Sequence, residues 1–123
     1  MPLSETTKEF VRAHITSLIQ LDAALLLKAD AGGWWSAERL AAELKVSVDA
    51  ARHALEELAA HNLLDVRIAT ELTYRFAPWH ANAAESMGEA ASHPYEAREV
   101  VVRGGRSAAQ RFADAFRVRK QDG

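Results

Sequence analysis

The stretch "SAERLAAELKVSVDAARHALEELAAHNLL", from Ser36 to Leu64, has the pattern of two helices joined by a tight turn. Ser36 and Ser47 stand where a serine can cap a helix by accepting a backbone hydrogen bond. Asn62 stands where a left-handed residue ends a helix, a position that is usually glycine. These features predict a helix-turn-helix. In its second helix, apolar residues recur at the three- and four-residue spacing of an amphipathic helix: Ala51, Leu55, Leu58 and Ala59.

Two alternating runs after this unit predict a β-hairpin. Apolar side chains occupy every second position of residues 64–68 and of residues 72–76, which is the period of a half-buried strand. The short gap between the runs favours a hairpin, and Pro78 ends the second strand. The side chains expected to face the core are Leu64, Val66, Ile68, Leu72, Tyr74 and Phe76.

A strongly apolar helix is predicted before the helix-turn-helix. Ser17 with Gln20 has the spacing of a capping box, and "LIQLDAALLLKAD" follows it as residues 18–30. This run is apolar over most of a helical circumference, so we expect the helix to lie at the centre of the core.

Two shorter elements are predicted on either side of this central helix. Thr6 and Glu9 have the spacing of a capping box, which predicts a short helix over about Thr7–His14. Trp34 and Trp35 predict a short strand. One indole should then enter the core and the other should stay partly exposed.

The order helix, short strand, helix, turn, helix, hairpin is that of a winged helix-turn-helix domain. The chain resembles bacterial winged-helix transcriptional regulators of the broad kind that includes the MarR and ArsR groups, from about Ser17 to Trp79. The resemblance rests on "WWSAERLAAELKVSVDAARHALEELAAHNLL" followed by "YRFAPW", with Asn62 in place of the usual glycine. It implies a mainly α fold with a small β-wing, and a DNA-binding transcriptional regulator. The expected domains are 1–16, an N-terminal arm or short helix; 17–79, the winged helix-turn-helix; and 80–123, a C-terminal helical extension.

The C-terminal extension is expected to serve packing or dimerisation. Asn82 with Glu85 has cap-like spacing for a helix that reaches about Ala91, and Pro94 interrupts it. "YEAREVVVR", residues 95–103, is predicted as either a helix or a strand because of its β-branched run. A last helix follows two glycines and is too short to be stable alone. The side chains expected to pack, or to form a homodimer, are Phe10, Val100, Phe112 and Phe116.

Charge is distributed unevenly along the chain. The formal net charge is −2, but residues 1–79 carry −3 and residues 103–120 carry +5. The second helix of the helix-turn-helix holds three carboxylates against a single arginine, Arg52. Long-range attraction to nucleic acid is therefore expected from the C-terminal segment more than from the helix-turn-helix.

In a helix-turn-helix, the start of the second helix meets base edges in the major groove. Arg52 could hold a guanine through two hydrogen bonds, and Val48 could contact a thymine methyl. Asp49 could accept a hydrogen bond from cytosine but would repel the phosphates. The outward-facing arginines of the hairpin would meet phosphates or the minor groove. The expected DNA-binding residues are Ser47, Val48, Asp49, Arg52, His53, Arg67 and Arg75.

Two functions remain open on this sequence. The first hypothesis is a regulator that reads double-stranded DNA. One subunit could neutralise only about three phosphates, and a dimer about six, so this regulator is expected to act as a homodimer. The second is a winged-helix protein–protein interaction adaptor, whose acidic face docks a protein partner while the basic C-terminal segment acts as a clamp. In that case the charges of the helix form surface pairs, Asp49 with His53 and Arg52 with Glu56.

Other classes of site lack their sequence patterns. The chain has no cysteine, which excludes disulfides and thiolate metal sites and fits a reducing cytoplasm. His53 and His61 are two helical turns apart, so neither a metal nor another cofactor is expected. No motif of a catalytic site is present, and we do not expect an enzyme. The most apolar run, Leu18 to Leu27, is interrupted by Gln20 and Asp22 and falls short of the roughly 20 residues that span a bilayer. No signal peptide is expected at the N-terminus.

Overall fold

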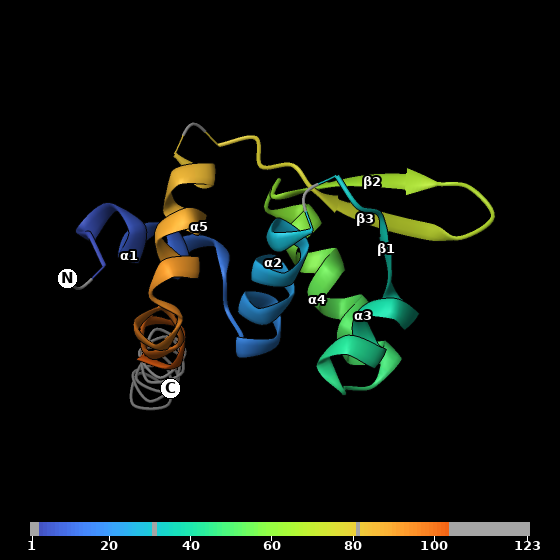
Figure 1. Ribbon diagram of the computed structural model, residues 1–123, viewed down its shortest axis with the longest axis horizontal. Coiled ribbons are helices and arrows are strands. Elements are labelled where there is room, and N and C mark those ends of the chain that lie inside the picture. Colours follow the sequence, from blue (N-terminus) through green and yellow to red (C-terminus); the bar gives the residue numbers. More distant parts are fainter. Residues whose placement is uncertain (1–2, 31, 81, 104–123) are drawn as a thin grey trace, which may run out of the picture.

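The computed structural model describes residues 3–30, 32–80 and 82–103 (Figure 1). Its elements follow the predicted order, and the mainly α fold with a small β-wing is confirmed. Residues 94–103 are helical, which decides between the two alternatives for this segment. The predicted last helix, with Phe112 and Phe116, lies outside the described residues. The other elements are α1 (Glu5–His14), α2 (Leu18–Ala29), β1 (Trp35–Ser36), α3 (Ala37–Leu44), α4 (Val48–Ala60), β2 (Leu64–Ile68), β3 (Leu72–Phe76) and α5 (Ala83–Ser92).

Serine caps fix the starts of the helices. Ser17, Ser36 and Ser47 each accept a hydrogen bond from the backbone N–H three residues later, at 3.2, 3.1 and 3.0 Å, as predicted. The first helix begins earlier than predicted, because Ser4 is its cap and accepts a hydrogen bond from the Thr7 N–H at 3.3 Å. The capping box predicted further along is wrong, since its residues lie inside α1.

Two residues with left-handed backbone end the helices of the helix-turn-helix. Asn62 has a φ of 62°, so the predicted left-handed end of the second helix is confirmed. Its carbonyl oxygen also accepts a hydrogen bond from the Trp79 N–H at 2.9 Å, which holds the segment after the hairpin against the end of α4. Lys45 ends α3 with a φ of 58°, although nothing in the sequence indicated this.

Helix α2 lies at the centre of the molecule, between the helix-turn-helix on one side and α1 and α5 on the other (Figure 1). Leu21 and Leu27 of α2, and Leu55 and Leu58 of α4, are fully buried. Burying each such leucine contributes roughly 1.5–3 kcal/mol. The predicted apolar faces of both helices are therefore the core of the protein. Each helix of the described part of the chain is too short or too polar to span a bilayer by itself.

The turn from α2 to β1 places the two adjacent tryptophans. Gly32 has a φ of 89°, and a Cβ on Gly33 would collide with the carboxylate of Asp30. That carboxylate accepts a hydrogen bond from Nε1–H of Trp35 at 3.0 Å. Trp35 is buried and Trp34 is half-buried, as predicted, but the strand begins at Trp35, one residue later than predicted.

The three strands form an antiparallel sheet in the order β1-β3-β2, and the β2–β3 hairpin projects beyond the helices (Figure 1). Leu64 and Tyr74, near the base of the hairpin, are buried. Towards its tip, Val66, Ile68 and Leu72 are 45%, 83% and 40% exposed, so the predicted burial of these three is wrong. The physical reason is length, because the strands continue past the helices that cover their inner face.

The C-terminal extension begins with α5, which ends at Ser92, close to the predicted end. Asn82 makes no side-chain hydrogen bond to the helix, so the cap predicted there does not form. The chain bends at His93, and the helical residues 94–103 then bury Val100 and Val101. The interruption predicted at Pro94 is therefore a bend between two helices.

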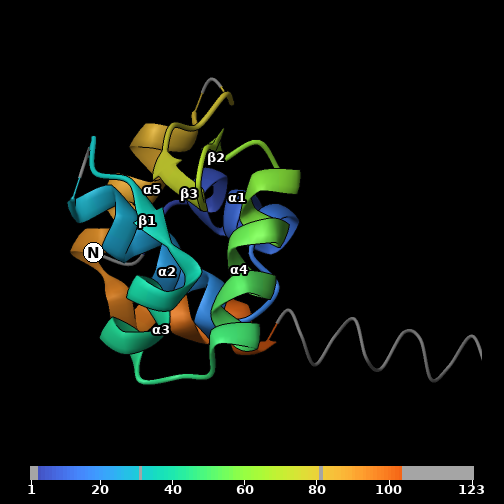
Figure 2. The same ribbon diagram turned by 90° about the vertical axis from the view of Figure 1, so that its right-hand side faces the viewer.

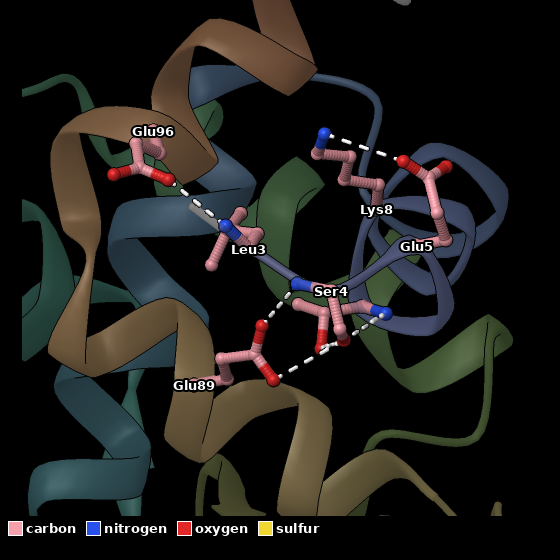
Figure 3. A network of polar contacts seen from close by, with 7 residues as sticks. Leu3, Ser4, Glu5, Lys8, Glu89 and Glu96 are labelled. Atoms are coloured by element: carbon pink, nitrogen blue, oxygen red, sulfur yellow. Dashed lines mark hydrogen bonds and ion pairs between the residues drawn. The ribbon is translucent and has the colours of Figure 1, made fainter. Parts of the chain in front are cut away.

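Two glutamates of this extension hold the N-terminal residues in place (Figure 3). The Leu3 N–H donates to Oε2 of Glu96 at 2.9 Å. The backbone N–H and the hydroxyl of Ser4 both donate to the carboxylate of Glu89. The hydrogen bond from the Ser4 backbone holds the pKa of Glu89 below its usual value. The beginning of α1 is thus attached to α5 and to the helix that follows it.

Candidate nucleic-acid interface

The outward face of α4 presents the residues predicted to meet DNA. Its inward face is taken by residues such as Ala51, Leu55 and Leu58, which are buried against α2 and α3. The helix therefore lies at the surface, joined to α3 by the turn at residues 45–47 (Figure 2). The predicted residues of this face are all exposed: Ser47, Val48, Asp49, Arg52 and His53.

The first turn of α4 combines a capped end with one acidic side chain. The Oγ atom of Ser47 accepts the backbone N–H of Ala50, so the hydroxyl proton remains available to donate to a ligand. Asp49 occupies the first turn, where the helix dipole favours a negative charge. The same carboxylate would oppose a phosphate at that helix end.

The arginine of this face is paired with Asp49. Nη1 of Arg52 lies 2.8 Å from Oδ1 of Asp49, one helical turn away. The sequence predicted two other pairs for this face, Arg52 with Glu56 and Asp49 with His53. In the structure, Arg52 and Asp49 pair with each other instead. An ion pair as exposed as this one contributes little to stability. Arg52 can therefore exchange it for a phosphate or a base at small cost.

The base of the hairpin holds a buried phenol, Tyr74. It lies on β3 and is buried, and burial raises the pKa of its phenol. The charge of Glu56 raises this pKa further, while that of Arg52 lowers it. Helix α4 and strand β2 contact each other, so the hairpin leaves the body of the molecule beside α4.

Both arginines of the hairpin cover the same indole. The guanidinium carbons of Arg67 and Arg75 lie 4.4 and 4.6 Å from the ring centroid of Trp34, within cation–π range. Arg75 also donates a hydrogen bond to Asp65 at 2.7 Å. The two arginines do lie on the outer face of the sheet, as expected, but they are held against it.

The tip of the hairpin is apolar and acidic. Ile68 and Leu72 face each other across the strands and are exposed, and Glu71 lies between them in the turn. Arg67 is the neighbour of Ile68 on β2, but its guanidinium lies over Trp34 and away from the tip. Across α4 and the hairpin, exposed and half-buried carboxylates outnumber guanidiniums: Asp49, Glu56, Glu57, Asp65 and Glu71 against Arg52, Arg67 and Arg75.

Three histidines that are remote in sequence meet beside this surface. Nδ1 of His14 lies 3.1 Å from Nδ1 of His61, and the rings of His14 and His80 are 4.4 Å apart. Nε2 of His80 donates to the carbonyl oxygen of His61 at 2.7 Å. Burial lowers the pKa of His14, and the neighbouring His80 and His61 lower it further. No sequence motif signals this cluster, since only the fold brings α1, the end of α4 and the segment after β3 together.

The histidine cluster is not arranged as a metal centre. Among the described residues, no group of three or more histidine, aspartate or glutamate side chains is placed to hold a metal ion. The hydrogen bond between the two Nδ1 atoms instead requires one ring to donate and the other to accept. At least one of the two rings must then be neutral.

Two of the residues predicted for packing or dimerisation are buried within the chain itself. Phe10 packs against the rings of His14 and His80, with centroids 4.8 and 6.0 Å apart. Val100 is buried in the same core. Both side chains thus already have partners inside one subunit.

Comparison with known proteins shows similarity in structure only. No protein-family model matches the chain, and no curated protein matches its sequence. Two structures of a double mutant of Lactococcus lactis ZitR have the same fold. One has a TM-score of 0.53 and 18% identity and covers 86% of this chain and 73% of that chain. The other, in the apo form, has a TM-score of 0.52 and 18% identity and covers 95% and 88%. The chain therefore shares the winged-helix fold with ZitR.

Proposed function

We propose that this protein is a DNA-binding transcriptional regulator of the winged-helix type. The observation that carries the proposal is the position of α4, whose first turns are exposed beside a hairpin that projects from the body of the molecule. A helix-turn-helix places this helix in the major groove, and the wing follows the adjacent backbone. The winged-helix fold shared with ZitR supports this reading.

The residues of α4 would divide the contacts with DNA among them. Arg52 exchanges its exposed pair with Asp49 for a guanine edge or a phosphate. The Ser47 hydroxyl donates to a phosphate, and Val48, whose side chain is exposed, contacts a thymine methyl. His53 lies one turn further along and reaches the backbone or a base.

Affinity is expected to require two subunits. Each phosphate neutralised contributes about 0.9 to the slope of log affinity against log salt. With three arginines on α4 and the hairpin, one subunit offers few such contacts, and two of these arginines are already paired with carboxylates. We therefore propose a homodimer that binds a palindrome with half-sites about one DNA turn apart. The net charge of +5 in residues 103–120 would add attraction to the phosphates.

The test is a fluorescence titration of the protein with DNA fragments from its own genomic locus and with random DNA of equal length, at several salt concentrations. We expect tighter binding to one locus fragment and a loss of affinity as salt rises. Arg52→Ala should weaken binding to that fragment by about 10-fold, as expected for the loss of one specific contact. A locus affinity equal to that of random DNA, and insensitive to salt, would contradict the proposal.

A protein-interaction adaptor is the second candidate, and the apolar face of the hairpin favours it. Val66, Ile68 and Leu72 form an exposed apolar strip, and the adjoining surface carries more carboxylates than arginines. Ile68→Lys separates the two functions. It should abolish docking of a protein partner, whereas it should leave DNA affinity unchanged or raise it by adding a cation.

A further inference from the structure

The outer face of the sheet carries an ordered row of side chains around Trp34. Because Trp35 pairs with Tyr74, Trp34 lies level with Arg75 on β3, on the face opposite the core. Arg67 lies on β2, the strand beyond β3. Its side chain must therefore cross β3 to bring its guanidinium carbon to 4.4 Å from the Trp34 centroid.

Thr73, which lies beneath the Arg67 side chain, is buried, and its burial indicates that the side chains on this face of the sheet are closely packed. Thr73 on β3 pairs with Arg67 on β2, so it lies under the path from Arg67 to Trp34. Although Thr73 is on the outer face of the sheet, it is only 7% exposed. Its Oγ1 atom has no hydrogen-bond partner among the described residues. Neighbouring side chains therefore cover this part of the sheet.

Arg67 and Arg75 both stack on Trp34, but only Arg75 is paired with a carboxylate. Arg75 is neutralised by Asp65 at 2.7 Å. Arg67 forms no ion pair with any carboxylate in residues 3–30, 32–80 and 82–103. Arg67 is also exposed, so its full positive charge faces the solvent.

Stacking on Trp34 leaves the N–H donors of Arg67 free to bind a ligand. A guanidinium that lies on an aromatic ring uses its face, while its N–H donors remain at the edge and can bind a phosphate in a forked geometry. The stack also restricts a long side chain whose rotamer entropy opposes binding. An arginine held in this way binds a phosphate without first having to be ordered.

We propose that Trp34 is a positioning residue, which holds the guanidinium of Arg67 in place to bind one phosphate of the DNA backbone. The inference rests on the proposed DNA binding. It assigns the phosphate contact of the wing to the outer face near its base, and not to the apolar tip with Ile68 and Leu72.

The first experiment is a graded series at position 34, Trp34→Tyr, Trp34→Phe and Trp34→Leu, with DNA affinity measured at several salt concentrations. Cation–π attraction is strongest for tryptophan, so affinity should fall along the series, by roughly 3- to 10-fold for leucine. Arg67→Ala should lower the salt slope by about 0.9. In the Arg67→Ala background, the same series should have almost no further effect on affinity.

The matched control is Trp79→Leu. Trp79 is 76% exposed and lies in the segment after β3, and no guanidinium of the described residues stacks on it. This variant should bind DNA like the unaltered protein. Thermal unfolding of every variant identifies those that no longer fold, and the Tyr and Phe variants keep the series informative if Trp34→Leu is one of them.

A second measurement is independent of DNA. NMR relaxation of the Arg67 Nε–H should show a restricted side chain in the unaltered protein and a mobile one in Trp34→Leu. If the protein binds no DNA, the proposed function is wrong, and so is the phosphate role. Two results would overturn the positioning role even where DNA binding is demonstrated. One is that Trp34→Leu lowers DNA affinity as much in the Arg67→Ala background as in the unaltered protein. The other is that the Arg67 side chain is equally mobile in the unaltered protein and in Trp34→Leu.

Discussion

The hydroxyl of Ser47 has two separable tasks at the start of α4. Its oxygen caps the helix through the Ala50 N–H, and its proton remains free to donate to a phosphate. Because the two tasks use different parts of one group, substitutions at this position can remove one and keep the other. The residue thus separates the stability of the helix from the proposed contact with DNA.

Ser47→Ala should lower the free energy of unfolding by about 1 kcal/mol, because one N–H of the first turn loses its acceptor. Ser47→Asp should retain most of the stability, since aspartate also caps and suits the helix dipole. The same variant should weaken DNA binding, because it adds a negative charge beside Asp49. Urea unfolding and DNA titration of both variants provide the check. Undiminished DNA affinity of Ser47→Asp would show that no phosphate lies near this end of α4.

At the scale of elements, the histidine cluster joins α1 to the end of α4 and to the segment after the hairpin. His14 is the central member, since it contacts both His61 and His80. Its pKa is lowered from 6.5, first by burial and then by the two neighbouring histidines. The unfolded chain therefore takes up a proton at a higher pH than the folded protein does. Stability due to His14 is present above pH 6.5 and is lost as the pH falls through the lowered pKa.

Replacing His14 should make stability less dependent on pH. The free energy of unfolding of the unaltered protein should fall between pH 7 and pH 5, and the fall should be shallower in His14→Gln. His93→Gln is the control, because His93 lies at the bend after α5, outside the cluster. Urea unfolding at several pH values measures both. A fall that is as steep in His14→Gln as in the unaltered protein would mean that other groups cause the acid sensitivity.

Strand β2 provides a matched pair of apolar residues with opposite surroundings. Leu64 is buried at the base of the hairpin, whereas Ile68 near the tip is 83% exposed. Leu64→Ala should therefore lower the free energy of unfolding by about 2–5 kcal/mol. Ile68→Thr should change it by less than about 0.5 kcal/mol, since an exposed side chain loses few contacts. Similar losses at both positions, measured by urea unfolding, would mean that the hairpin tip is covered in solution.

The faces of the hairpin strands could be predicted from the sequence, but the length over which the inner face is buried could not. Alternation identified the inner face of each strand correctly, but it could not tell how far the helices extend beneath that face, which is why Ile68 was expected in the core. The caps at Ser17, Ser36 and Ser47, and the left-handed Asn62, were predictable because each depends on a few neighbouring residues.

The surface chemistry was less predictable because it depends on side-chain orientation and on distant contacts. The spacing on α4 allowed several ion pairs, and only the structure selects Arg52 with Asp49. The stacking of Arg67 on Trp34 joins a residue of β2 to the residue before β1, and these two strands are not adjacent in the sheet. No local pattern of sequence specifies such a contact.

At the scale of the whole molecule, the charges of the body and of the C-terminal segment oppose each other. Deleting residues 103–123 would change the net charge from −2 to −6. The core formed by the described helices would keep nearly all its buried residues, so we expect the shortened chain to fold. Its DNA affinity should fall by at least 10-fold at low salt, with a smaller salt slope, because several cations are lost.

Sedimentation of the shortened and full-length proteins shows whether this segment also holds two subunits together. A lower mass after deletion would assign it to the dimer interface, as proposed from the apolar faces of the extension. If DNA affinity and its salt dependence are both unchanged, the positive segment takes no part in binding.

The three tryptophans occupy three different environments: Trp35 is buried, Trp34 lies beneath two guanidinium groups, and Trp79 is largely in solvent. Intrinsic tryptophan fluorescence can therefore report on both folding and ligand binding. Emission from Trp35 should follow unfolding, while quenching and a spectral shift of Trp34 should register any ligand that draws Arg67 away from the sheet, without an attached dye.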